Sequence, residues 1–232
     1  MIALLVCCNM AFAQDIMSGH YKKALVIGAH PDDPESMSGG TILMLKKQGC
    51  EVVNVYLTQG EGGIPGKSEA EAREIRHEEA LEACKVLGVR AVFLTQVDGR
   101  TEINKERYDE MRKVIEEEKP DLVITHWPID SHRDHRNCSL LVYDAWRLTG
   151  HSFDLYYCEV MAGNQTQTFT PNSYVDISGV RDLKLKAYLC HKSQKLEGAV
   201  KKYHDPMEAM RGREFQCDYA EAYVKQVWNR KQ

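Results

Sequence analysis

Short apolar runs alternate along the chain with segments in which apolar residues recur at helical spacing. Apolar runs of this kind are typical of strands buried on both faces, and they lie at 23–28, 52–57, 91–94 and 122–124. Segments of helical pattern lie between these runs, at 40–47, 68–87 and 108–118. The pattern therefore predicts strands and helices in strict alternation.

This alternation predicts an α/β fold, a Rossmann-like three-layer sandwich with a mostly parallel central sheet. In the commonest doubly wound order, 3-2-1-4-5, the first and fourth strands are neighbours, and ligands bind in the crevice at their carboxyl ends. The 232 residues suit one large α/β domain, and we expect residues 14–232 to form a single domain.

The two segments richest in His and Asp directly follow those two strands. Residues 29–35 read AHPDDPE, and residues 126–135 read HWPIDSHRDH. Histidine and carboxylate without cysteine suit a catalytic Zn²⁺ site with three protein ligands and one open position. His30 and Asp33 can turn to one side of a tight loop, and His135 can supply a third ligand. The alternative is a set of surface turns in which Asp32 or Asp33 acts only as a cap.

At these motifs the chain resembles the LmbE-like, PIG-L family of zinc-dependent N-acetylglucosaminyl deacetylases. The family pattern AHPDDE…GGT is similar to residues 29–41, and its HxDH motif is similar to residues 132–135. Weaker similarities extend to residues 220–223, so the resemblance covers nearly the whole chain. It implies a metal-dependent hydrolase that removes the N-acetyl group from an N-acetylglucosamine-containing substrate, a small-molecule sugar or sugar conjugate.

The resemblance also implies a role for individual residues. The implied zinc ligands are His30, Asp33 and His135. The implied catalytic residues are Asp32 as general base, His132 as electrophile and general acid, and Asp134 as the orienting partner of His132. The implied sugar contacts are Arg76 and Asp98. The chain departs from the family pattern at Pro34, where a Glu is usual, with Glu35 one position later; no zinc ligand is lost.

Two other functional classes are considered as alternatives. A nucleotide-binding Rossmann protein is disfavoured because Gly28-Ala29-His30 is not a GxGxxG motif and the following carboxylates would repel a pyrophosphate. A non-catalytic secreted sugar-binding module could use Asp32 and Asp33 to bind hydroxyls. Bound zinc together with acetate release would exclude both.

Residues 1–13 are almost wholly apolar and end in Ala11-Phe12-Ala13, which is similar to a signal-peptidase site. We therefore expect a signal peptide and a periplasmic or secreted protein. The alternative is a buried N-terminal strand, in which case the protein is cytoplasmic. The mean hydropathy of the whole chain is -0.46, and no apolar run of about 18 residues follows residue 13, which excludes a polytopic membrane protein.

Charge bears on the possible binding partners, and cysteine spacing bears on disulfides. The chain has 30 Lys+Arg against 34 Asp+Glu, a net charge of -4, and no basic block, so a nucleic-acid partner is excluded. The cysteines after residue 13 form no C-x-x-C pair, and we predict no required disulfide. The Lys-rich stretch 184–202 predicts a solvated helix face. A homo-oligomer stays possible.

Overall fold

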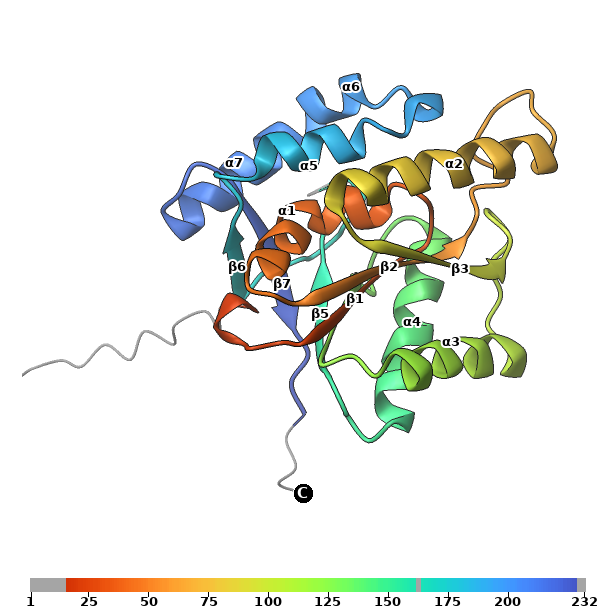
Figure 1. Ribbon diagram of the computed structural model, residues 1–232, viewed down its shortest axis with the longest axis horizontal. Coiled ribbons are helices and arrows are strands. Elements are labelled where there is room, and N and C mark those ends of the chain that lie inside the picture. The colour runs from red at the N-terminus through yellow and green to blue at the C-terminus, as the bar shows by residue number, and fades with distance from the viewer. Residues whose placement is uncertain (1–15, 162–163, 229–232) are drawn as a thin grey trace, which may run out of the picture.

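One seven-stranded sheet runs through the part of the chain described by the structure, a computed structural model that covers residues 16–161 and 164–228 (Figure 1). The strands are β1 (Lys23–Gly28), β2 (Glu51–Thr58), β3 (Arg90–Gln96), β4 (Leu122–His126), β5 (Asp154–Cys158), β6 (Ser173–Asp176) and β7 (Ala220–Lys225). Their order is β3-β2-β1-β4-β5-β7-β6. Strands β1 to β5 are parallel, and β7 is antiparallel to both its neighbours. The predicted fold class is confirmed, and so is the order 3-2-1-4 of the four predicted strands.

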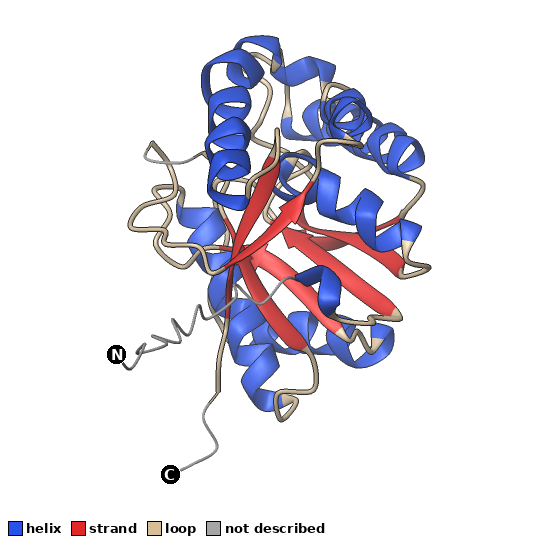
Figure 2. Cartoon of the chain, turned by 90° about the vertical axis from the view of Figure 1, so that its left-hand side faces the viewer, coloured by secondary structure: helices blue, strands red, loops and turns tan. Residues whose placement is uncertain are grey.

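Helices cover both faces of this sheet (Figure 2). The longer ones are α1 (Asp33–Lys47), α2 (Glu69–Leu87), α3 (Lys105–Glu118), α4 (Arg133–Leu148), α5 (Arg181–Tyr188) and α7 (Asp205–Phe215). Shorter turns are η1 (Ile16–Ser18), η2 (Lys192–Gln194), α6 (Glu197–Ala199) and the π-helix η3 (Val200–His204). The predicted signal peptide, residues 1–13, lies outside the described residues.

Each face of the sheet buries its own apolar cluster. On one face Ile42 and Leu45 of α1 pack with Val26 of β1, and α2 and α5 lie over the same side (Figure 1). On the other face Met111 of α3 and Leu141 of α4 form the second cluster with strand residues. Because β1 and β4 are buried on both faces, as their apolar runs predict, they are fixed in the centre of the sheet.

Helix α1 begins at Asp33, so the expectation that it opens at residue 40 is wrong. Pro34 fits the first turn of a helix, where a backbone N–H would have no intrahelical partner. Gly40 inside the helix is explained by packing, since a Cβ there would collide with Ile177. The consequence for the site is that the first His/Asp motif forms the entry to a helix.

The structure of the Lys-rich stretch, residues 184–202, also differs from the expected solvated helix face. It is not one solvated helix: α5 is followed by short turns and a π-helix, and Lys184 is fully buried. The Lys184 ammonium lies 2.6 Å from Glu208 and 2.7 Å from Glu221. These ion pairs tie α5 to α7 and β7. Within residues 16–161 and 164–228, none of the helices has the length and apolar character needed to cross a membrane.

Candidate active site

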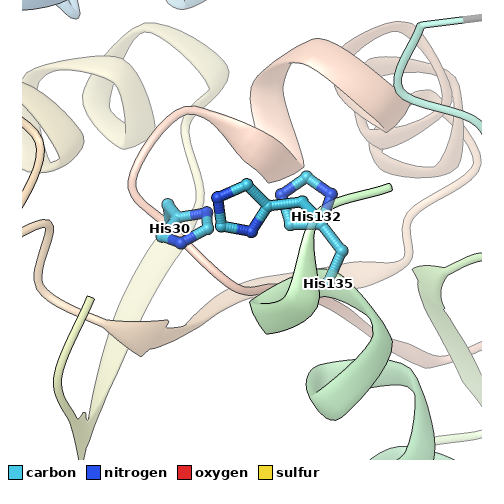
Figure 3. Close-up of side chains that lie close together, drawn as sticks. All are labelled: His30, His132 and His135. Carbon is cyan, nitrogen blue, oxygen red and sulfur yellow. The ribbon is translucent and has the colours of Figure 1, made fainter. Parts of the chain in front are cut away.

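The two His/Asp motifs meet at the carboxyl ends of β1 and β4. These strands are parallel neighbours, with Ile27 opposite Thr125, so the loops that follow them leave the same edge of the sheet. Figure 3 shows the imidazole of His30, from the first loop, beside those of His132 and His135, from the start of α4. The ring centroid of His30 lies 4.8 Å from that of His132 and 5.3 Å from that of His135.

The shape of the first loop separates its two carboxylates. The backbone N–H of His30 donates to Asp33 Oδ2 at 2.7 Å, which folds the Asp33 side chain back towards His30. Asp32 has a φ of 107°, an unusual backbone conformation for a residue with a side chain. Its carboxylate lies 3.1 Å from Arg76 Nη2, so the two carboxylates of the loop have different partners.

Asp33 lies between two imidazoles. Its Oδ2 is 3.3 Å from His30 Nδ1, and its Oδ1 is 3.4 Å from His135 Nε2. Burial raises the pKa of this carboxyl, but the imidazoles of His135 and His126 outweigh burial and hold the pKa well below its usual value. The carboxylate is therefore ionised at neutral pH, as metal coordination requires.

The second motif is positioned by the N-terminus of α4. His132 is the N-cap, and its Nδ1 accepts the backbone N–H of Asp134 at 3.3 Å. This places His135 in the first helical turn. Its Nδ1 lies 3.3 Å from Asp130 Oδ2 and 3.0 Å from Gln165 Nε2. The other ring nitrogen, Nε2, faces Asp33 Oδ1, so it is the nitrogen placed to bind a metal beside that carboxylate.

The donor set fits a divalent cation. Ligand atoms of His30, His132 and His135 lie within 4.8 Å of one another, and so do those of two overlapping groups, Asp33 with His126 and His135, and His30 with Asp98 and Asp134. Burial lowers the pKa of His30, but the carboxylates around it raise that pKa well above its usual value. The surroundings of His30 thus favour positive charge, which a metal ion would supply.

His126, at the end of β4, belongs to the second motif, although sequence reasoning assigns it no role. Its Nε2 accepts the backbone N–H of Ala29 at 3.0 Å, so that nitrogen is already used. Burial and the neighbouring His135 lower its pKa to about 4, which keeps the ring neutral. The ring stacks on His135 at a centroid distance of 3.9 Å. His126 therefore contacts both motifs, through Ala29 and Asp33 on one side and His135 on the other.

The carboxylate of Asp134 has a different partner from the one expected. It accepts hydrogen bonds from the backbone N–H of Gly99 and the hydroxyl of Thr101, both at 2.7 Å, and lies 3.3 Å from His30 Nε2. Only its backbone N–H contacts His132. The expected orientation of His132 by this carboxylate is corrected: the carboxylate orients His30, because helix geometry turns it away from the N-cap side chain.

The two predicted sugar contacts line the same cavity, whose volume is about 400 Å³. Arg76 is buried, and its Nη2 donates to Pro31 O and Asp32 Oδ2. Its Nε and Nη1 have no hydrogen-bond partner among the described residues. Asp98 Oδ1 lies 3.2 Å from His30 Nε2. Both side chains thus line the cavity beside the His and Asp side chains of the two motifs.

The far wall of the cavity comes from the C-terminal third of the chain. It includes Tyr188, Gln194, Leu196, Ala199 and His204. Sequence reasoning assigns none of these residues a role. They lie on α5, on α6 and on turns of only a few residues, whose apolar and polar positions follow no regular period.

Comparisons with known proteins show what the whole chain is similar to. The family model described as PIG-L, GlcNAc-PI de-N-acetylase, matches residues 25–146. The diacetylchitobiose deacetylase of Thermococcus kodakarensis is 33% identical over 75% of this chain and 70% of its own length. The 4-oxalmesaconate hydratase of Pseudomonas putida is 27% identical over 78% of each chain. The structure of the N,N'-diacetylchitobiose deacetylase from Pyrococcus horikoshii matches with a TM-score of 0.78 and 27% identity, covering 89% of this chain and 84% of that one.

Proposed function

The chain belongs to the PIG-L family of GlcNAc-PI de-N-acetylases, and we propose that it is a zinc-dependent hydrolase that removes the N-acetyl group from an N-acetylglucosamine-containing substrate. The deacetylase relatives support a hydrolase that removes acetyl groups. The observation that carries the finer proposal is the position of Asp33 between His30 and His135, with Asp32 lining the same cavity.

Zinc is the metal that this donor set suits best. His30, Asp33 and His135 would hold it, as two neutral imidazoles and one carboxylate, which is the ligand number of a catalytic zinc site that keeps a position open. When bound, zinc supplies a Lewis acid that polarises an amide carbonyl and lowers the pKa of water. The cavity leaves room beside these ligands for substrate.

Asp32 is the proposed general base. Burial raises the pKa of its carboxyl, while the Arg76 guanidinium opposes this rise. A carboxyl with a raised pKa accepts a proton from water more readily than an ordinary one does. Arg76 also holds the carboxylate in place through the Nη2 hydrogen bond, so that it stays directed to the cavity.

His132 is proposed to act on the carbonyl oxygen of the substrate or on its departing nitrogen. Its ring lines the cavity beside His30, and its Nδ1 is occupied by the backbone N–H of Asp134, which leaves Nε2 for the substrate. Water adds to the acetyl carbon and gives a proton to Asp32; the C–N bond then breaks and the nitrogen takes up a proton. The products are acetate and a free amine, and His132 stabilises the oxyanion or protonates the amine.

Other chemistry must be tested because one relative is a hydratase. A hydratase adds water to a carbon–carbon double bond and releases no acetate. The sugar-binding and nucleotide-binding alternatives likewise release none. Acetate release therefore separates the proposed function from each of these.

The test is a metal and activity measurement on the same purified protein. We expect about one equivalent of zinc per chain and stoichiometric release of acetate and amine from N-acetylated sugars. Chelation should abolish the release, and zinc should restore it. Zinc binding without acetate release from any N-acetylated sugar or conjugate would overturn the deacetylase assignment. Acetate release that survives metal removal would overturn the zinc dependence.

A further inference from the structure

The acidic residue that follows Pro34 is buried beside the site, although the proposed chemistry does not use it. Glu35 lies in the first turn of α1, two residues after the proposed zinc ligand Asp33, and is 0% exposed. Its Oε1 accepts hydrogen bonds from the Tyr56 hydroxyl at 2.6 Å and from Asn54 Nδ2 at 2.9 Å. Tyr56 and Asn54 both belong to β2, so the sheet holds one of the two carboxylate oxygens.

The other oxygen of Glu35 faces a histidine from the C-terminal third of the chain. Glu35 Oε2 lies 3.4 Å from Nε2 of His191, which is also 0% exposed. Neither of these two atoms has a hydrogen bond to another described residue. An unpaired polar group is costly to bury, and a charged one more so. We therefore expect the two side chains to depend on each other for their burial.

His191 belongs to a stretch of chain that forms part of the cavity wall. It is the N-cap of η2, and its backbone N–H donates to Tyr188 O at 3.3 Å. This stretch, residues 188–199, is here called the wall segment, and the residues by which it lines the cavity are Tyr188, Gln194, Leu196 and Ala199. Glu35 and His191 are not among the described residues that line the cavity. Their contact can therefore affect a substrate only through neighbouring residues.

Further contacts hold the wall segment to other parts of the chain. The backbone N–H and the hydroxyl of Ser193 donate to Glu79 of α2, each at 2.7 Å. Gln194 Nε2 donates to Gly63 O at 3.1 Å, in the loop after β2. The contact of His191 is different because it reaches α1, the helix that the first His/Asp motif enters. Figure 1 shows α5, which leads into the wall segment, beside α1 and α2.

His191 also lies near the proposed general base. Burial raises the pKa of the Asp32 carboxyl, and Arg76 and His191 are among the groups that oppose this rise. Because such an interaction weakens with distance, His191 is a neighbour of the loop that carries Asp32. The same histidine is thus close to the first motif and belongs to the wall segment.

From these contacts we propose that Glu35 and His191 are positioning residues: their buried contact holds the wall segment against α1 and so fixes the width of the cavity between this wall and the metal ligands. This inference rests on the proposed deacetylase function and goes beyond it. The wall segment lines the cavity but supplies no proposed metal ligand. Loss of the contact should therefore weaken substrate binding, while zinc binding and the chemical step are kept.

Substitution of His191 tests the proposal on the zinc-loaded full chain, with N,N'-diacetylchitobiose as the substrate. His191→Leu removes both ring nitrogens. We expect KM to rise about tenfold, with kcat within about threefold of the wild-type value and zinc near one equivalent, because a misplaced wall weakens binding and leaves the chemistry intact. His191→Gln, whose side-chain amide can donate to Glu35 Oε2, should restore most of the lost affinity.

A merely structural defect would give a different result. It lowers the fraction of active enzyme, so kcat falls while KM keeps the wild-type value. This result, or an unchanged KM at unchanged kcat, would overturn the proposal. His151→Leu is the matched control and should keep the wild-type KM, because His151 also has a buried nitrogen without a partner among the described residues but lines a different cavity.

Substitution of Glu35 tests the other half of the contact. Glu35→Gln keeps an oxygen for Tyr56 and Asn54 but replaces the charged oxygen that faces His191. KM should again rise, and the double variant with His191→Leu should show little more than the larger single effect, because both substitutions remove one contact. Effects on KM that multiply would overturn the pairing. If His191→Leu does not fold, Glu35→Gln decides alone: a raised KM at constant kcat supports the proposal, and an unchanged KM overturns it.

Hydrogen–deuterium exchange separates this inference from the proposed function, because it needs no substrate. In His191→Leu, faster exchange should be confined to the wall segment and the adjoining η3, with α4 exchanging as in the wild type. If N-acetylated sugars release no acetate, the deacetylase function fails, yet this confined change still supports the positioning role. If acetate is released and both KM and the exchange of the wall segment are unchanged, the function stands and the positioning role is wrong. Exchange that rises throughout the chain would also overturn it.

Discussion

Asp134 Oδ2 lies 3.3 Å from His30 Nε2, although the two residues are 104 positions apart in the sequence. The opposite nitrogen of the same ring, Nδ1, faces Asp33. A carboxylate behind an imidazole fixes both its orientation and its tautomer, and raises its basicity as a metal ligand. Helix α4 therefore carries one proposed zinc ligand, His135, and also the residue that orients another.

Replacing Asp134 should weaken metal binding. We expect Asp134→Asn to raise the zinc dissociation constant by about 10–100-fold, because the amide no longer attracts the His30 proton as a carboxylate does. Thr101→Val, which removes the hydroxyl that holds this carboxylate, should act in the same direction but less strongly. Competition with a chromophoric chelator measures both. Asp144→Asn, on the same helix but outside the site, is the control; equal affinities in all variants would contradict the orienting role.

The contact between Asp134 and His30 also shows which kind of contact cannot be predicted from the sequence. The motif places Asp134 two positions from His132, and the family resemblance implied that these two side chains pair. The backbone turn at the start of α4 directs the carboxylate instead to Gly99, Thr101 and His30, which come from two other loops. A partnership across loops depends on tertiary structure and leaves no local pattern.

The central sheet could be predicted because each of its first strands is an apolar run of the length that a doubly buried strand needs. The same argument located the site, since both His/Asp motifs directly follow β1 and β4. The C-terminal third could not be predicted in this way. Lys184 and Glu208 look like surface residues in the sequence, yet they are buried as a pair. Burial of charge by mutual pairing cannot be deduced from hydrophobic periodicity.

Loss of the buried ion pair between Lys184 and Glu208 should strongly destabilise the fold. Lys184→Met removes the only ammonium that faces both Glu208 and Glu221 in the described contacts, and leaves two buried carboxylates without it. We expect the free energy of unfolding to fall by about 3–5 kcal/mol, as is typical when one partner of a buried ion pair is deleted. Urea denaturation measures this. Lys186→Met, at an exposed position on the same helix, should change stability little; an equal loss in both variants would contradict the burial argument.

The free energy of unfolding should also fall in acid, because of the same ion pair between Lys184 and Glu208. Burial raises the pKa of Glu208, but Lys184 and Arg181 outweigh it, so the folded-state pKa is lower than the ordinary value of 4.5. A lowered pKa means that the contribution of Glu208 is present above pH 4.5 and is lost as the pH falls through the folded-state pKa. Glu208→Gln should therefore flatten the acid side of the stability curve. A curve with the wild-type slope would contradict this assignment.

The N-terminal segment carries a separate prediction about location. We propose that residues 1–13 are removed and that the protein is exported, because the apolar segment ends in Ala11-Phe12-Ala13. Intact-mass measurement of protein from the native host should then find a chain that begins at Gln14, in the periplasmic or extracellular fraction. Replacing Ala13 by a bulky residue should block the cleavage. Recovery of a cytoplasmic chain that retains Met1 would refute the export prediction.

Removing a ligand should remove the metal. His30→Ala and His135→Ala should each lose most of the bound zinc, because three protein ligands leave no redundancy. His151→Ala, which lies outside the candidate metal clusters among the described residues, should keep about one equivalent. Elemental analysis after dialysis measures the content. Full zinc occupancy at wild-type affinity in either ligand variant would show that the ligand set is wrong.

The two adjacent carboxylates of the first loop should respond differently to the same substitution. Asp32→Asn keeps the size of the side chain but cannot accept a proton at neutral pH, so zinc should stay near one equivalent while kcat falls on the order of 10²-fold or more. Asp33→Asn should weaken zinc binding first, because a neutral amide oxygen is a poorer zinc ligand than a carboxylate. Metal content and kcat are measured on both variants side by side.

The structure gives the physical reason for this asymmetry. Asp33 folds back to His30 through the backbone N–H hydrogen bond and lies between two imidazoles, whereas Asp32 is directed to Arg76 by its left-handed backbone. If Asp32→Asn loses zinc while Asp33→Asn retains it, the two roles are reversed. Arg76→Lys adds an independent check: it should lower kcat with little change in zinc content, because the guanidinium holds the base and has no atom that binds a metal.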